Sequence, residues 1–136
     1  MTTSGIAPVE ELLKAYTEFK MKGKADYLVV KIEDEKLKLM SKGNGSIADV
    51  AKLKEIQSQE HAYFVVYRMK PPKSGGNSKL VLIRWVPESC STRDKMLIAS
   101  SQNKVLTDLE GLQQKTFGAT SLNELTEARL VEEFYS

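Results

Sequence analysis

The stretch of sequence that decides the fold runs from Trp85 to Ser101 and reads Trp-Val-Pro-Glu-Ser-Cys-Ser-Thr-Arg-Asp-Lys-Met-Leu-Ile-Ala-Ser-Ser. It begins as the end of an apolar strand, is interrupted by Pro87, and continues with helical spacing. We expect a helix over residues 91–110 with two different faces. One face is apolar enough to pack on a core and contains Ile98, Gln102, Val105 and Leu109. The other mixes charge, sulfur and small side chains, which suits a contact surface, and contains Arg93, Met96 or Leu97, Ser100 and Lys104.

Length and composition indicate one globular domain. A chain of 136 residues, alone or as a module of a longer protein, can bury a core without metal or disulfide support. The single cysteine, Cys90, excludes an intramolecular disulfide and a multi-cysteine metal site, and it favours a reducing compartment. A net charge of +2 is too small to indicate a nucleic-acid partner. No apolar run approaches the roughly 18 residues of a membrane span, and the N-terminus lacks the apolar region of a signal peptide, so a cytosolic protein is expected.

The chain is expected to begin with an arm and a helix. Residues 1–7 are small and polar, which predicts a mobile arm, and a single domain is expected over residues 8–136. Pro8 suits the first position of a helix that carries an apolar stripe and ends at Gly23.

Two strands and a second helix should follow. Strands are predicted over residues 27–32 and 37–39, and residues 42–45 are typical of a loop. Ser46 and Asp49 resemble a capping box at the start of a helix. The apolar residues on one side of that helix are Ile47, Val50, Leu53 and Ile56.

The central strands are predicted over residues 62–67 and 80–85. Both are nearly continuous apolar runs, which is typical of strands covered on both faces. Residues 114–119 favour a short last strand, and a final helix capped by Ser121 should carry Leu122, Leu125, Leu130 and Phe134. Together these elements predict an α/β (α+β) fold, in which a mixed sheet lies between layers of helices.

One motif resembles a known family. The motif consists of Trp85-x-Pro87-Glu88, then Arg93-x-Lys95-Met96, then Ala99-Ser100-Ser101. It resembles the actin-depolymerising-factor homology (ADF/cofilin) family, which includes cofilins and twinfilins. The resemblance extends over nearly the whole chain. It implies the family's gelsolin-like fold: a five-stranded, mostly antiparallel sheet with two helices on each side.

Catalytic chemistry is not indicated, and we predict that the protein is not an enzyme and needs no cofactor or metal. The only histidine, His61, lies at the start of a predicted strand, where a structural or solvated role is commoner than a catalytic one. Cys90 is interpreted as an incidental loop cysteine. The glycines at residues 43–45 and 75–76 lack the strand-to-helix context of a phosphate-binding loop and are interpreted as turns.

The resemblance implies a binding site for the actin monomer. In the family this helix inserts between two actin subdomains, so Arg93 and Lys95 would pair with actin carboxylates and Met96 would fill the cleft. The remaining residues that the resemblance assigns to the monomer site are Ser4, Gly5, Ile6, Ser100 and Lys104. Ser4 is also the expected phosphorylation site, since a phosphate there would repel an acidic partner.

Filament binding is predicted to be weak. The family uses basic residues before the fourth strand and charged residues in the last helix, and the corresponding residues here are Asn77, Lys79 and Arg129. Asn77 replaces one expected cation, and the last helix is mainly acidic near its end. The expected function is therefore binding of actin monomers, by resemblance ADP-actin, with a role in filament turnover and reduced filament side-binding and severing.

Two alternatives stay open. The first is a phosphoinositide-responsive membrane adaptor that uses Lys70, Lys73, Lys79 and Lys104. The second is a family relative that binds an actin-related complex instead of actin. A monomeric protein of the cytoplasm and the actin cytoskeleton, cofilin-like with a mild similarity to a twinfilin repeat, is the expected form.

Overall fold

The structure of the protein is a computed structural model that describes residues 7–8, 10–23, 25–71 and 77–135. Six strands form one sheet in the order β1-β3-β2-β4-β5-β6. The strands are β1 (Ala7–Pro8), β2 (Tyr27–Glu33), β3 (Lys36–Gly43), β4 (Tyr63–Met69), β5 (Lys79–Trp85) and β6 (Thr116–Ala119). The helices are α1 (Glu10–Lys22), α2 (Ile47–Ala51), α3 (Lys54–Gln57), α4 (Thr92–Asp108) and α5 (Glu127–Tyr135), with a 3-10 turn, η1, at Leu122–Glu124.

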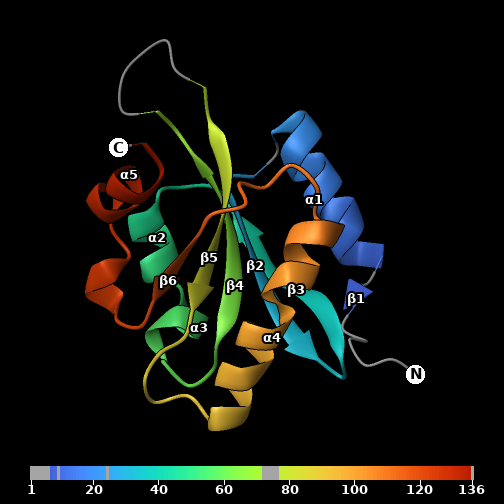
Figure 1. The fold of residues 1–136 in the computed structure, drawn as a ribbon. Coiled ribbons are helices and arrows are strands. Elements are labelled where there is room, and N and C mark those ends of the chain that lie inside the picture. The colour runs from blue at the N-terminus through green and yellow to red at the C-terminus, as the bar shows by residue number, and fades with distance from the viewer. Residues whose placement is uncertain (1–6, 9, 24, 72–76, 136) are drawn as a thin grey trace.

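The predicted mixed, mostly antiparallel sheet is confirmed. Strands β2, β3, β4 and β5 pair antiparallel, and β6 lies parallel to β5 at one edge. These are the five principal strands, and the two-residue β1 adds a parallel pair at the other edge, beside β3. Figure 1 shows α1 and α4 on one face of the sheet and α2, α3 and α5 on the other. The sheet therefore lies between two layers of helices, as expected.

Each face of the sheet carries its own hydrophobic core, because side chains alternate along a strand. On the side of α1 and α4 the core includes Leu28, Val30, Phe64, Val66 and Leu82. On the side of α2, α3 and α5 it includes Val29, Val65, Val81, Ile83 and Trp85. The predicted burial of the two central strands on both faces is thus confirmed for β4 and for the middle of β5.

The first helix begins later than expected, and Pro8 is not its first residue. Ala7–Pro8 forms β1 and pairs in parallel with residues 36–37 of β3. A proline has no N–H to donate, which an edge strand tolerates. The first helical residue is Glu10. Residues 1–6 of the expected arm lie outside the described residues.

The second predicted helix is divided into α2 and α3. Its capping box is confirmed, since the Ser46 N–H donates a hydrogen bond to Asp49 Oδ2 at 2.8 Å. The division falls at Leu53, whose backbone is extended (φ −63°, ψ 143°). The apolar side still packs on the core, with Ile47, Val50 and Ile56 buried and Leu53 half-buried.

The last predicted helix is also divided. The Ser121–Glu124 pair caps only the turn η1, where Glu124 Oε1 accepts a hydrogen bond from the Ser121 N–H at 3.1 Å. Leu125 then leaves the helical conformation (ψ 72°), and α5 begins at Glu127.

Several element boundaries differ from the prediction by one to four residues. Helix α4 ends two residues early, at Asp108, and β6 begins at Thr116. Strand β3 continues through Gly43, which was expected in a loop. A Cβ atom on Gly43 would lie 2.5 Å from the hydroxyl oxygen of Tyr27, so a larger residue at this position would require the Tyr27 ring to move.

Candidate functional site

Helix α4 carries two distinct faces, as the sequence predicts. Ser91 caps its start, because the Ser91 Oγ accepts a hydrogen bond from the Asp94 N–H at 3.0 Å. The buried face contains Ile98, Ser101, Val105 and Leu106, and Leu109 is buried just beyond the end. Gln102 is half-buried at the edge of that face. Ser101, which the sequence analysis assigns to neither face, is 2% exposed and belongs to the buried one.

The outward face of α4 forms what we call the α4 ridge: Arg93, Lys95, Met96, Ala99 and Ser100. All five are exposed, and the Met96 side chain is 65% exposed. Leu97, the alternative to Met96, is half-buried. Within the part of the chain that the structure describes, the side chains of Arg93 and Lys95 make no hydrogen bond or ion pair. Lys104 differs, because its Nζ pairs with Asp108 Oδ2 at 3.3 Å.

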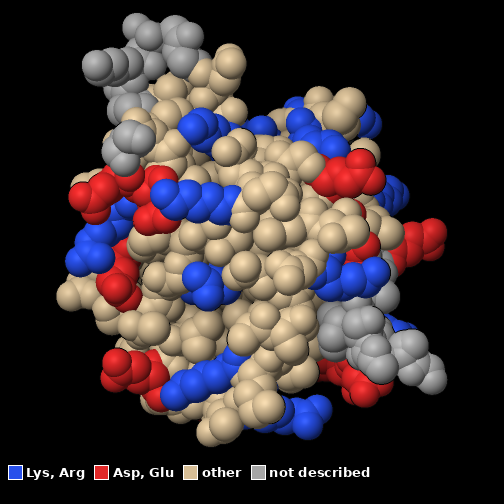
Figure 2. Space-filling model, viewed as in Figure 1, with Lys and Arg blue, Asp and Glu red and all other residues tan. Residues whose placement is uncertain are grey.

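The charge on this side of the molecule is unevenly distributed. Figure 2 shows basic side chains among uncharged surface in the middle of the view, where Figure 1 places α4, β5 and β6. Most of the acidic side chains in the same view lie towards its margins. The α4 ridge thus presents a large apolar side chain between unpaired cations, an arrangement that fits an acidic partner with an apolar groove.

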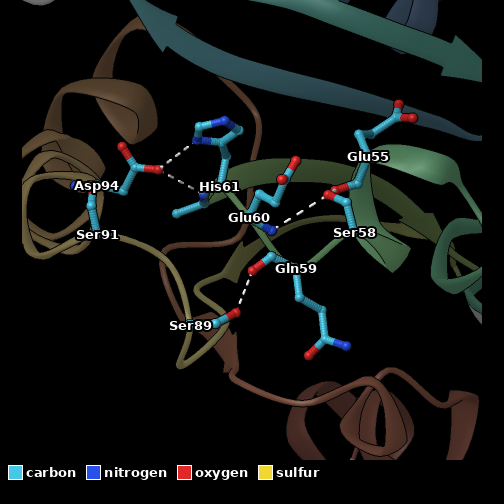
Figure 3. A network of polar contacts seen from close by, with 9 residues as sticks. Glu55, Ser58, Gln59, Glu60, His61, Ser89, Ser91 and Asp94 are labelled. Carbon is cyan, nitrogen blue, oxygen red and sulfur yellow. Dashed lines mark hydrogen bonds and ion pairs between the residues drawn. The ribbon is translucent and has the colours of Figure 1, made fainter.

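The first turn of α4 is tied to the connection between α3 and β4 (Figure 3). The Asp94 carboxylate lies 3.1 Å from His61 Nδ1 and accepts a hydrogen bond from the Ala62 N–H at 3.3 Å. In the loop before α4, the Ser89 hydroxyl donates to the carbonyl of Gln59. These contacts fix the start of α4 and so position Arg93 and Lys95. The signal in the sequence that could have identified Asp94 is its position three residues after Ser91, which is the spacing of a helix cap.

The other end of α4 is held by α1. The Tyr16 hydroxyl donates a hydrogen bond to the Glu110 carbonyl at 2.6 Å, and Lys20 Nζ donates to the same oxygen at 3.0 Å. Burial, with a smaller contribution from the charge of Glu110, raises the pKa of Tyr16 to about 12. The phenol therefore stays a protonated donor at neutral pH. With both ends fixed, the α4 ridge is a preorganised surface.

The two residues weighed for catalysis lie near the start of α4. His61 is exposed and contacts Asp94, as a structural histidine would. Cys90 is buried, and this burial, followed by the negative charge of Asp94, raises the pKa of its thiol. A raised thiol pKa leaves less of the nucleophilic thiolate at neutral pH. Among the described residues, no group of three or more His, Cys, Asp or Glu side chains could hold a metal ion, and no helix is long and apolar enough to cross a bilayer.

Two of the three predicted filament-binding residues meet at the end of α5. Lys79 Nζ donates a hydrogen bond to the Phe134 carbonyl at 2.6 Å and lies 4.4 Å from the centre of the Tyr135 ring. The Tyr135 hydroxyl donates to the Asn77 carbonyl at 2.8 Å. The third, Arg129, lies elsewhere on α5 and has its Nη1 3.9 Å from Glu124 Oε2. The ammonium group of Lys79 therefore already has two partners within the molecule, the Phe134 carbonyl and the Tyr135 ring.

Some of the remaining predicted residues lie outside the described part of the chain. These are Ser4, Gly5, Ile6 and Lys73, so their assignment stays a prediction. The first described residues, Ala7–Pro8, lie in contact with α4.

The sequence over residues 5–135 matches the family of cofilin/tropomyosin-type actin-binding proteins. The chain belongs to this family. A cofilin from Yarrowia lipolytica is 28% identical over 136 residues, which cover 97% of this chain and 88% of that protein. An actophorin from Entamoeba histolytica is 27% identical over 126 residues, covering 90% of this chain and 89% of the other.

Solved structures of the ADF/cofilin type share this fold. The crystal structure of Streptomyces griseoflavus cofilin matches with a TM-score of 0.79 and 19% identity, over 95% of this chain and 98% of that one. The crystal structure of Plasmodium berghei actin depolymerization factor 2 matches with a TM-score of 0.78 and 20% identity, over 99% of this chain and 100% of that one. The ADF-homology fold inferred from the Trp85 to Ser101 motif is therefore confirmed. As a member of this family, the protein is an actin-binding protein.

Proposed function

We propose that this protein binds monomeric actin through the α4 ridge and promotes depolymerisation of actin filaments. The observation that carries the proposal is the exposed Met96 between the unpaired cations of Arg93 and Lys95. A flexible thioether adapts to an apolar groove, and the flanking cations orient the helix against acidic groups. A protein with the same fold is named actin depolymerization factor 2, which supports the depolymerising role in this proposal.

Binding of the monomer in preference to the filament is part of the proposal. Lys79 already donates to the α5 carbonyl terminus, and Arg129 faces Glu124, so both cations have partners within the chain. Arg93 and Lys95 lack such partners among the described residues and are free for an incoming carboxylate. Preference for ADP-actin and slowed nucleotide exchange extend the proposal by family resemblance.

A phosphoinositide-responsive adaptor is not favoured. Of the lysines that would form such a patch, Lys79 and Lys104 are engaged by the Phe134 carbonyl and by Asp108. A family relative that binds an actin-related complex is not favoured either, since cofilins and an actophorin are among the similar proteins. We further propose that the protein acts as a monomer, in the cytoplasm and at the actin cytoskeleton.

Two binding assays test this proposal together. Fluorescent monomeric actin titrated with the protein should saturate, whereas filaments sedimented with the protein should carry little of it into the pellet. Because the predicted filament cations already have partners within the chain, the protein concentration that half-saturates filaments should lie well above the one that half-saturates monomers. Strong pelleting with filaments combined with no monomer binding would contradict the proposal.

A further inference from the structure

Arg84 is a charged residue on the face of the sheet that packs against α1 and α4. It lies in β5 two residues after Leu82, which is fully buried on the side of α1 and α4, so the two side chains leave the same face of the sheet. Its neighbours across the sheet are Phe64 in β4 and Gly118 in β6. Arg84 itself is half-buried.

The guanidinium of Arg84 has no partner within the described part of the chain. No hydrogen bond or ion pair reaches it there, and its Nε is buried without an acceptor. Gly118 makes room for it, because a Cβ atom on Gly118 would lie 2.8 Å from Arg84 Nη2. The glycine on β6 thus leaves space for an arginine side chain that no carboxylate among the described residues neutralises.

A cavity of about 310 Å³ lies beside this guanidinium, and it contains a second cation. Arg84 and Lys95 both line it, and no aspartate or glutamate is among the described residues that do so. The other lining residues are apolar or small: Val86, Ile98, Ala99, Gly118, Ala119 and Thr120. Two cations therefore line the pocket, and no acidic side chain among the described lining residues compensates their charge.

We propose that this pocket binds a carboxylate side chain of the actin molecule docked on α4. The pocket is continuous with the α4 ridge, because Lys95 and Ala99 belong to both. An arginine fork can hold a carboxylate through two parallel hydrogen bonds, and partial burial strengthens them. An actin molecule docked on the α4 ridge holds its acidic side chains close to this pocket. Their effective concentration there is higher than that of a free anion in solution. The inference rests on the proposed function and adds Arg84 to it.

An unpartnered cation that serves a partner should cost the free protein some stability. Replacing Arg84 by methionine removes the charge and keeps much of the apolar stem, so the urea midpoint of the free protein should stay the same or rise. The same variant should raise the dissociation constant for monomeric actin about tenfold. Arg84→Lys keeps the positive charge but lacks the guanidinium fork. Its dissociation constant for monomeric actin should therefore lie between those of the wild type and Arg84→Met. Lys52→Met, at an exposed lysine after α2, is the matched control and should leave both quantities unchanged.

The outcomes separate this pocket from the proposed function. If the wild-type protein does not bind monomers, the proposed function itself fails. If wild-type binding is present and Arg84→Met binds equally well, only the pocket assignment is overturned. A lower urea midpoint in Arg84→Met would overturn it too, because it would make Arg84 a structural residue. Thermal protection of the wild type, but not of Arg84→Met, by inorganic phosphate with equal actin affinities would assign the pocket to a free anion instead.

Discussion

Replacing Arg93 and Lys95 together by alanine is expected to raise the dissociation constant for monomeric actin at least about tenfold, or about 1.4 kcal/mol. Both side chains are exposed and form no ion pair with the described residues, so the change removes no contact that holds the fold. The loss should come from two charge pairs at the interface, one on each side of Met96. Fluorescence titration of labelled actin monomers measures it directly.

A matched control exists on the other layer of helices. Lys52 and Lys54 have the same spacing, are exposed, and lie at the junction of α2 and α3. Their double alanine variant changes the net charge equally, so it should reproduce any effect of total charge and leave the affinity otherwise unchanged. Affinity for actin that is the same in the Arg93/Lys95 variant and in the wild type, with the fold intact, would refute the assignment of α4.

Replacing Met96 by glutamate is expected to weaken monomer binding about a hundredfold, near 3 kcal/mol. The wild-type side chain is 65% exposed in the free protein, and in the complex it would be enclosed by an apolar groove. A carboxylate at the same position would lose its water without finding a cation in the groove. The same titration, with the unfolding midpoint measured in parallel, separates the loss of binding from a loss of stability.

Met21 provides the control for this prediction. It is 71% exposed on α1, so Met21→Glu makes the same chemical change at a similar exposure away from the α4 ridge. Its affinity should stay that of the wild type. Met96→Leu should keep most of the affinity, because the side chain stays large and apolar. Equal losses for the two glutamate variants would place the binding surface elsewhere.

The two faces of α4 could be predicted from the sequence because helical periodicity depends only on spacing. Ile98, Val105 and Leu109 repeat at intervals that bring them to one side, and the structure buries them. The side on which Ser101 lies could not be predicted, since a small polar side chain gives no strong signal for either face. Its buried hydroxyl has no partner among the described residues, an arrangement that spacing alone does not predict.

The contacts that position α4 could not be predicted, because they join residues far apart in the chain. Asp94 contacts His61 and Ala62, which lie 33 and 32 residues earlier in the chain, and Tyr16 contacts Glu110 across 94 residues. The divisions at Leu53 and Leu125 have a similar origin, since apolar residues on both sides of each break still read as one helical stripe.

Arg84 shows a third limit of sequence reasoning. A single arginine near the end of an apolar strand is usually interpreted as an exposed residue at the strand's margin. The pocket that Arg84 lines depends on the parallel register of β5 and β6, which places Gly118 beside it. It also depends on α4, which brings Lys95 to the same cavity. Both relations follow from the tertiary structure.

The methyl spectrum of the methionines tests the α4 ridge most directly. In the free protein Met96, Met21 and Met40 are exposed on three different elements, whereas Met69 is buried. With methionine methyl groups labelled with carbon-13, addition of monomeric actin should shift or broaden the Met96 resonance first and leave those of Met21 and Met40 nearly unchanged. An unchanged Met96 resonance under conditions where actin is bound, or a change confined to Met21 or Met40, would contradict the account.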